Sequence, residues 1–264
     1  KDSPLDREAL IRGNSVYFVG KVIPMLPEKL SNQICSLVPN EDRLTYSVII
    51  EMTPRGKIID YSIHKTIINS KRRFTYEEAQ RVIDEGKGDL ADDILLLNKI
   101  AQQFRKKRMN EGSFDFISPE VKFKLDENGV PIDILIKQTM QSNMLIEEYM
   151  LLANKIVAKH IAAPKSGPIK PFIYRVHDLP DKEKILEFAL FVKTLGYSFD
   201  PNASLKSIGF QNLLNQVKGK EEEALVNELA IRSMAKAVYA AENIGHYGLG
   251  FKYYTHFTSP IRRY

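Results

Sequence analysis

The sequence predicts an α+β fold in which mostly antiparallel sheets and hairpins are flanked by helices. Runs of β-branched residues joined by short turns indicate antiparallel hairpins. Apolar residues at helical spacing indicate several amphipathic helices. The two kinds of element come in separate blocks along the 264 residues, which favours α+β over a doubly wound parallel sheet.

The first part of the chain is expected to be irregular, because six prolines and glycines interrupt the short apolar pieces of residues 1–43. The next part has a clear strand signal. Residues 44–52 and 57–69 are rich in β-branched side chains, and the turn 53–56 (Thr-Pro-Arg-Gly) joins them. These two runs therefore predict an antiparallel hairpin.

A second hairpin is predicted further along the chain. Its strands are residues 121–125 and 131–138, and its turn is 126–129 (Asp-Glu-Asn-Gly). Asn-Gly is a strong turn signal because both residues tolerate positive φ.

Helical periodicity is clearest over residues 143–161. An apolar stripe on this helix is expected to face the core, formed by Ile146, Tyr149, Met150, Ala153, Ile156 and Val157. A short strand is predicted over 172–177, after a loop rich in Pro, Gly, Ser and Lys. The other predicted helices cover residues 76–85, 90–109, 182–196, 205–217 and 221–239.

The composition allows an ordinary globular protein with a mildly basic surface. Lysine and arginine number 38 against 33 aspartates and glutamates, giving a net charge of +5, which permits a polyanionic partner without demonstrating one. No apolar run is long enough to span a bilayer, and no signal-peptide pattern begins the sequence. With Cys35 as the single cysteine, an internal disulfide framework is excluded, so a cytoplasmic protein is expected. The protein is also expected to be a monomer. Because no Met precedes Lys1 and a dense motif runs up to Tyr264, we expect the chain to be a fragment.

The last ten residues differ from every other stretch, since they combine arginines and hydroxyl side chains with a proline and aromatic rings. The planar guanidinium groups of Arg262 and Arg263 suit phosphate oxygens. Hydroxyl and backbone N–H groups near Ser259 could hold a phosphodiester in register. The alternative is a surface loop with solvated arginines.

Other candidate residues have a functional and a plainer interpretation. Tyr17 could stack on a nucleic-acid base, but a tyrosine packed in the core is more common. His177 and Asp178 could supply a base or form a hydrogen-bonded structural pair. The basic run 105–108 could contact RNA, yet cations also stabilise the C terminus of a helix.

Several of these residues belong to longer motifs, which occur in order from Ser3 to Tyr264. The motifs are SPLDREALIRGNSVYF, VIPMLPEKLSN, CSL, DRL, EEYMLLAN, RVHD and GHYGLGFKYYTHFTSPIRRY. With these motifs the chain resembles the catalytic domain of the RNase II/RNase R family, and within that family the ribonuclease R branch. The resemblance covers essentially the whole chain.

The resemblance implies an RNB-type ribonuclease domain, present here in truncated form over residues 1–264. Members of this family are processive, magnesium-dependent hydrolases. They degrade single-stranded RNA from its 3′ end and release nucleoside 5′-monophosphates. The expected partner is therefore single-stranded RNA, and the expected cofactor of the full-length enzyme is Mg²⁺.

The resemblance also assigns roles to individual residues. Arg262 corresponds to the catalytic arginine, while Tyr76 and Glu147 correspond to positions that favour ribose over deoxyribose. Tyr17 corresponds to one of the two rings that stack the terminal bases. Its partner corresponds to Phe116, and Phe114 is the alternative because it lies two residues away on the same face of an expected strand.

One departure from the family pattern concerns the metal. The family holds its magnesium ions with an aspartate cluster N-terminal to the SPLDREA segment, and nothing in this sequence matches that cluster. Asp92 and Asp93 form the one aspartate pair, and they read as charge favoured by a helix dipole. No metal ligand is therefore assigned. The isolated chain is expected to be inactive, and the RNA-binding domains that flank the catalytic domain in the family are absent.

A function from another class remains open. The chain could come from a non-catalytic RNA-binding relative whose aspartates have decayed. A purely structural domain would leave the combination of Arg262, Tyr17 and Glu147 unexplained.

Overall fold

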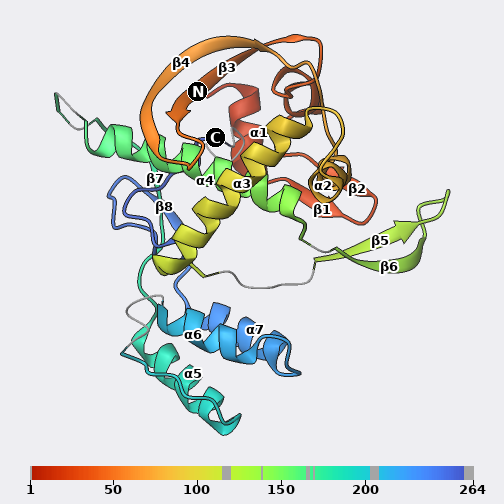
Figure 1. Cartoon of the computed structure of the whole chain (residues 1–264). Coiled ribbons are helices and arrows are strands. Elements are labelled where there is room, and N and C mark those ends of the chain that lie inside the picture. The colour runs from red at the N-terminus through yellow and green to blue at the C-terminus, as the bar shows by residue number, and fades with distance from the viewer. Residues whose placement is uncertain are drawn as a thin grey trace. The chain divides into compact units, whose positions relative to one another are not determined.

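The computed structural model confirms the α+β class, with helices and small antiparallel sheets (Figure 1). The described residues of Lys1–Leu96 and Pro119–Asn143 form a first compact unit, and those of Leu97–Ser118 and Met144–Thr258 form a second. None of the helices in these stretches is long and apolar enough to cross a membrane. The structure describes residues 2–114, 120–137, 139–164, 167–168, 170–202 and 208–258.

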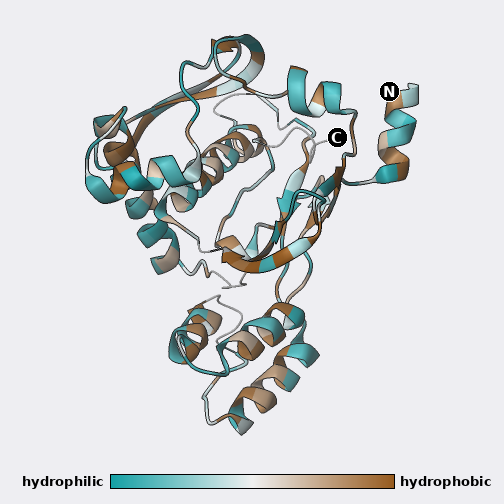
Figure 2. Cartoon of the chain, turned by 90° about the vertical axis from the view of Figure 1, so that its right-hand side faces the viewer, coloured by the Kyte–Doolittle hydropathy of each residue, from teal (hydrophilic) through white to brown (hydrophobic). Residues whose placement is uncertain are grey.

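The N-terminal segment is more regular than the sequence predicted. It contains helix α1 (Pro4–Arg12), the antiparallel strands β1 (Val16–Phe18) and β2 (Lys21–Ile23), and the π-helix η1 (Lys29–Ile34). The hydroxyl of Ser3 caps α1 by accepting a hydrogen bond from the N–H of Asp6, and glycine ends the helix with positive φ. The apolar periodicity of the α1 sequence is weak. The helix buries only one residue, and most of it is hydrophilic in Figure 2.

The first predicted hairpin is confirmed as strands β3 (Asp42–Met52) and β4 (Ile58–Asn69), which pair antiparallel over their whole length. The turn between them is closed by the N–H of Gly56, which donates to the carbonyl of Thr53 at 2.8 Å. Gly56 has φ +71°, a conformation that favours glycine.

The second hairpin is confirmed as β5 (Glu120–Leu125) and β6 (Pro131–Lys137), but its turn differs from the expected one. Gly129 has positive φ, whereas Asn128 does not. The carboxylate of Asp126 accepts the N–H of Asn128 at 2.9 Å, and the register shifts at the end of β5. The side chain of Asp126 therefore shapes this turn, and one glycine is enough to close it.

Two predicted helices, α2 and α3, carry candidate site residues or the residues that hold them. Helix α2 (Tyr76–Glu85) has the predicted bounds, and a reciprocal capping box between Thr75 and Glu78 fixes its start. Helix α3 (Ala91–Asn110) carries Asp92 and Asp93 in its first turn, both exposed, which agrees with their interpretation as charges favoured by the helix dipole.

The second unit holds a helical core around Phe188 and Phe210, and the apolar residues of its helices appear brown in Figure 2. One predicted helix, 221–239, is shorter than expected. It ends at Ser233, and the chain becomes extended so that residues 238–240 pair antiparallel with residues 174–176. The elements are α4 (Gln141–Ala162), β7 (Tyr174–Val176), α5 (Lys182–Thr194), α6 (Ile208–Val217), α7 (Glu223–Ser233), β8 (Val238–Ala240) and η3 (Tyr247–Leu249).

Helix α4 buries only part of the predicted stripe. Ile156 and Val157 are buried as predicted, whereas Ile146 and Met150 are exposed. Three polar residues of the helix are also buried, namely Ser142, Glu148 and Asn154. The buried polar side chains indicate that α4 does more than pack against the core, because a buried polar group is stable only with a hydrogen-bond or ion-pair partner.

Candidate functional site

The structure places only part of the predicted site. Tyr17, Tyr76 and Glu147 are described, with the two tyrosines in the first unit and Glu147 in the second. The other predicted residues lie outside the described stretches, namely Phe116, Ser259, Arg262 and Arg263.

Tyr17 is available for stacking. It is the central residue of the short strand β1, opposite Val22 of β2, and its exposed fraction is 76%. The alternative interpretation, a tyrosine packed in the core, is therefore wrong. An exposed ring held by strand pairing on a short hairpin offers a flat apolar face at low cost in side-chain entropy.

Tyr76 is the first residue of α2 and is also exposed. The basic residues just before it are partly held by the fold. Arg72 forms ion pairs with Glu78 and Asp89, at 3.5 and 2.9 Å, and its guanidinium lies 4.2 Å above the ring of Phe74. These contacts fix the entry to α2 and so the position from which Tyr76 projects.

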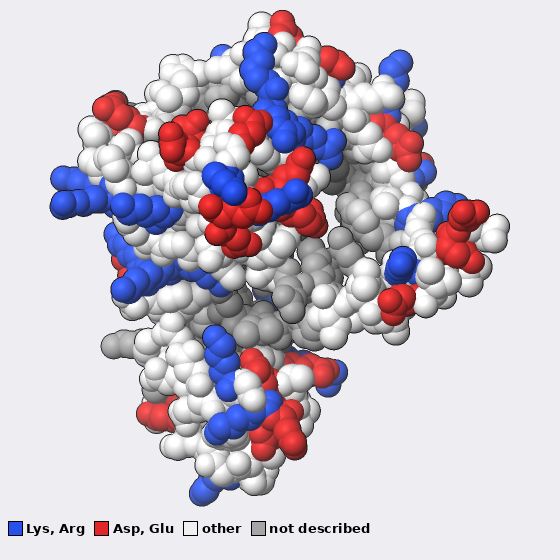
Figure 3. Space-filling view, turned by 45° about the vertical axis from the view of Figure 1, so that its right-hand side comes forward, with Lys and Arg blue, Asp and Glu red and all other residues white. Residues whose placement is uncertain are grey.

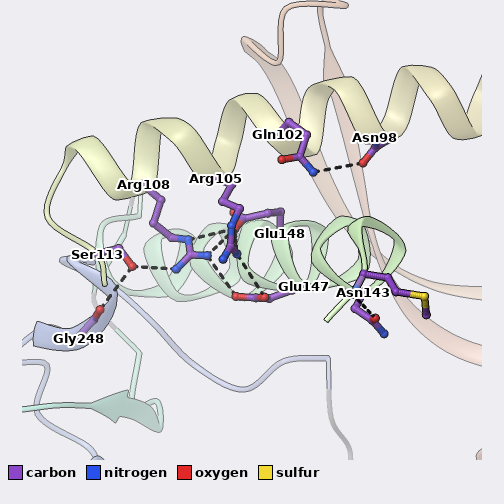
Figure 4. A network of polar contacts seen from close by, with 10 residues as sticks. Asn98, Gln102, Arg105, Arg108, Ser113, Asn143, Glu147, Glu148 and Gly248 are labelled. Carbon is purple, nitrogen blue, oxygen red and sulfur yellow. Dashed lines mark hydrogen bonds and ion pairs between the residues drawn. The ribbon is translucent and has the colours of Figure 1, made fainter. Parts of the chain in front are cut away.

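The densest polar arrangement in the second unit joins the end of α3 to α4, and Figure 4 shows it closely. The guanidinium of Arg108 is 3.1 Å from a carboxylate oxygen of Glu147 and 2.5 Å from one of Glu148. It also donates to the hydroxyl of Ser113 at 2.8 Å. Arg105 approaches the same two carboxylates at 3.6 and 3.7 Å.

The burial of this network decides how its members act. Arg108 and Glu148 are exposed by only 4% and 3%, whereas the side chain of Glu147 is 44% exposed. A buried ion pair is tolerated only when further hydrogen bonds satisfy its remaining donors and acceptors, as Ser113 does here. The buried pair thus forms a fixed base from which the carboxylate of Glu147 reaches solvent.

The basic run 105–108 therefore has a role that neither sequence interpretation anticipated. Arg105 and Arg108 turn toward the acidic pair on α4, while Lys107 points away and is 74% exposed. Sequence reasoning missed Arg105, Arg108 and Glu148 as parts of the site. The available signal was the acidic pair itself, since two adjacent carboxylates on a helix that faces a core need cationic partners.

Phe114, the alternative stacking residue, is excluded by its surroundings. Its ring is buried and packs against those of Phe210 and Tyr247, with centroid distances of 5.9 Å in each case. The chain at Phe114 is also not a strand. Phe116, the first choice, lies outside the described residues and stays a prediction.

The RVHD motif (residues 175–178) packs against the run of glycines and aromatic residues at 245–256. Two backbone N–H groups donate to this run at 3.0 Å. That of Arg175, in β7, donates to the carbonyl of Tyr254, and that of His177, just after β7, donates to the carbonyl of Gly245. The imidazole Nδ1 of His177 accepts the N–H of Gly248 at 3.1 Å. A Cβ on Gly248 would lie 3.0 Å from the same Nδ1, so the close approach requires glycine.

The two histidines of this packing, His177 and His246, have a structural role. Burial lowers the pKa of His177, and burial together with the neighbouring His177 lowers the pKa of His246 to about 3. The carboxylate of Asp178 accepts the N–H of Leu179. His177 and Asp178 therefore do not form the hydrogen-bonded pair that the sequence suggested, and His177 is held by the glycine run instead.

The electrostatics of the surface are mixed. On the face drawn in Figure 3, basic and acidic side chains are interspersed and neither sign forms a continuous field. No group of three or more His, Cys, Asp or Glu side chains that could hold a metal ion occurs among the described residues.

Comparisons with known proteins agree with the motifs. Residues 1–264 match the family model described as RNB domain. Ribonuclease R 1 of Lactococcus lactis subsp. lactis is 37% identical over 271 residues, covering 100% of this chain and 33% of the relative. This chain spans between about a third and two fifths of the length of the curated relatives it matches.

Solved structures show the same fold. The structure of Mycoplasma genitalium RNase R in complex with ribose-methylated single-stranded RNA matches with a TM-score of 0.87 and 29% identity, over 99% of this chain and 41% of that one. Yeast Ssd1, a pseudonuclease, matches with a TM-score of 0.73 and 22% identity, over 99% of this chain and 32% of that one. The second likeness shows the fold alone.

Proposed function

This chain belongs to the RNB domain family, and on that basis we propose that it is part of a processive exoribonuclease. The enzyme would hydrolyse single-stranded RNA from its 3′ end and release nucleoside 5′-monophosphates. The observation that carries the proposal is the match of the family model over residues 1–264. The likeness in fold to an RNase R that was solved with RNA supports the same activity.

The length of the relatives supports a longer parent protein, of which this chain would be a partial catalytic domain. We propose that the parent requires Mg²⁺ and that the ligands of the ion lie outside this chain, so the isolated chain is inactive. The single cysteine supports a location in the reducing cytoplasm, and we propose that the protein is a monomer.

Tyr17 is proposed to stack on a base near the RNA 3′ end, with Phe116 as its partner. Its exposure supports this role. Stacking on an aromatic ring contributes about 1–3 kcal/mol per base and tolerates any sequence, because every base presents a π face. An enzyme that reads its substrate in this way degrades RNA of any sequence.

Glu147 and Tyr76 are proposed to distinguish ribose from deoxyribose. An ionised carboxylate only accepts hydrogen bonds, so it selects a donor such as the 2′-OH. The contact with Arg108 leaves the carboxylate of Glu147 partly exposed and fixes its direction. Tyr76 offers an exposed phenol at the first position of α2.

Arg262 is proposed to neutralise the charge that builds on the scissile phosphate. A preorganised cationic donor aimed at that charge is a large term in such reactions. Ser259 and Arg263 are proposed to hold the neighbouring phosphodiester, as hydroxyls and planar guanidinium groups do elsewhere.

The test uses the full-length protein that contains this chain and 5′-labelled single-stranded RNA with Mg²⁺. We expect progressive shortening from the 3′ end and release of nucleoside 5′-monophosphates. The isolated chain, assayed beside it, should release none. Internal cleavage or nucleoside 3′-phosphates as products would overturn the proposal.

A second candidate function is a non-catalytic RNA-binding relative. The lack of any match to the family's aspartate cluster in this sequence favours it, because a fold alone does not imply catalysis. The same assay separates the two. RNA binding by the full-length protein without any release of mononucleotides would support the second candidate and exclude the first.

A further inference from the structure

Two arginines of α3 contact the carboxylate of Glu147, one at each of its oxygens. Arg108 donates a hydrogen bond to the Oε1 atom at 3.1 Å, and a guanidinium nitrogen of Arg105 lies 3.6 Å from the Oε2 atom. The arginines are three positions apart, which places them on one face of the helix, and Figure 4 shows both pointing toward α4. Each carboxylate oxygen therefore has a cationic partner on the same neighbouring helix.

Arg108 is itself fixed by other contacts. It is 4% exposed and forms an ion pair with the buried Glu148. It also donates to the hydroxyl of Ser113 at 2.8 Å, and this hydroxyl donates to the carbonyl of Gly248 at 3.4 Å. A buried hydrogen-bonded network of this kind specifies one arrangement of its side chains. The position of Arg108 is therefore set by the fold around it and not by Glu147 alone.

Glu147 remains accessible while the arginines hold it. Its side chain is 44% exposed, whereas that of Glu148 is only 3% exposed. An ionised carboxylate has about four lone-pair sites and only accepts hydrogen bonds, so an arginine at each oxygen still allows a hydroxyl donor to bind. Of the two adjacent glutamates, Glu148 thus anchors the arginine and Glu147 faces outward.

A mobile glutamate would recognise a single hydroxyl poorly. Glutamate is among the side chains that lose the most rotamer freedom when they are ordered, and this loss counts against binding. Arginines that order the carboxylate in advance remove this cost. An acceptor held in one direction also rejects a substrate that lacks the matching donor, because the acceptor is then left unpaired.

We propose that Arg105 and Arg108 are positioning residues for ribose recognition. They act through Glu147, whose carboxylate they hold in one orientation for the 2′-OH of the RNA. This inference rests on the proposed function, which assigns ribose recognition to Glu147.

The contacts of the two arginines differ in kind. Arg108 donates from one planar guanidinium to Glu147, Glu148 and Ser113, a pattern that the point charge of a lysine does not reproduce. The contacts of Arg105 with the two carboxylates, at 3.6 and 3.7 Å, are longer than hydrogen bonds, so the charge matters more there than the donor geometry. Lysine should therefore replace Arg105 but not Arg108.

The test measures the preference for ribose, which a purely structural role would not change. Single-turnover cleavage by the full-length protein is measured on single-stranded RNA and on the same RNA with 2′-deoxyribose in its last nucleotides. The preference is the ratio of the two rates, in which any loss of folded protein cancels. The variants are Arg108→Lys, Arg105→Gln and Arg105→Lys. The control is Lys99→Gln, which changes an exposed cation elsewhere on α3.

We expect Arg108→Lys and Arg105→Gln each to lower the preference by at least about fivefold, the scale of one hydrogen bond to a charged group. Arg105→Lys should keep the preference within about twofold of wild type, because the charge is retained. Lys99→Gln should leave it unchanged. Should Arg108→Lys not fold, the two variants of Arg105 decide the outcome. A preference that stays at the wild-type value in Arg105→Gln would overturn the inference.

A double variant separates this inference from the proposed function. If the arginines act through Glu147, then Arg105→Gln should lower the preference by less than about twofold in a Glu147→Gln background. An equal loss in both backgrounds would mean that Arg105 acts on the RNA independently of Glu147, and the inference would be wrong. An unchanged preference in Glu147→Gln alone would instead refute the assigned role of Glu147, whatever the arginine variants gave.

Discussion

The buried ion pair of Arg108 and Glu148 allows a quantitative test of how much this pair stabilises the folded protein. We consider Arg108→Met, which keeps the approximate volume and removes the charge. In the variant, Glu148 remains 3% exposed, and its nearest remaining cation is Arg105 at 3.7 Å. A buried carboxylate that loses its main partner cannot recover solvation, so the folded state bears the cost.

The size of this cost follows from the burial. Removing one partner of a buried ion pair costs about 3–5 kcal/mol. The contact with Glu147 adds little, because the side chain of Glu147 is 44% exposed and water screens it. Arg105 offsets part of the loss. We therefore expect a loss of about 3 kcal/mol, which lowers the Tm.

The measurement is calorimetric unfolding of the full-length protein, with Lys107→Met as the matched control. Lys107 is on the same helix but 74% exposed, with a weak ion pair to Glu111 at 3.8 Å, so its change should cost less than about 0.5 kcal/mol. Arg108→Met combined with Glu148→Leu should recover most of the stability, because no buried charge is left unpaired. A loss below about 1 kcal/mol for Arg108→Met would refute the reasoning.

Three further predictions concern single side chains. Tyr17→Ala should weaken RNA binding by about 1–3 kcal/mol, which is roughly 5- to 150-fold in the Kd measured by fluorescence anisotropy. Tyr17→Phe keeps the ring and should bind nearly as tightly as wild type. Equal binding by all three proteins would rule out stacking. Glu147→Ala should lower the preference for RNA over the same sequence of DNA in single-turnover cleavage, and an unchanged preference would remove Glu147 from ribose recognition. The pKa of His246 is about 3 in the folded protein and 6.5 for an ordinary histidine, so the unfolded chain binds the proton first and stability should fall as the pH drops from about 6.5 toward 3. Denaturant unfolding should show a smaller decline for His246→Gln, and the same decline in both proteins would contradict this assignment.

The sequence predicted the elements whose signals are local. The hairpin of β3 and β4 and the helix α2 follow from β-branched runs, a turn glycine and a capping box, which act between near neighbours. Helix α1 also had local signals in its serine cap, its first-turn proline and its terminal glycine, although its weak apolar periodicity concealed them.

The features that the sequence could not predict depend on distant contacts. Residues 238–240 continue a helical pattern, but pairing with β7 draws them into a strand. On α4, Glu148 and Asn154 are buried because Arg108 and the backbone of Phe257 reach them from other parts of the chain. Apolar periodicity places polar residues outside, so it predicted the burial of Ile156 and Val157 but not that of Glu148 and Asn154.

The most direct test of the central claim is single-turnover cleavage of single-stranded RNA by the full-length protein, together with equilibrium RNA binding. Wild type, Arg262→Lys and Arg262→Ala are compared. We predict that wild type releases nucleoside 5′-monophosphates and that both variants are slower by roughly a hundredfold or more, with lysine giving no rescue because a point charge does not reproduce the planar donor pair. RNA binding should change far less. Near-normal cleavage by Arg262→Ala, or no cleavage by the wild-type protein, would contradict the account.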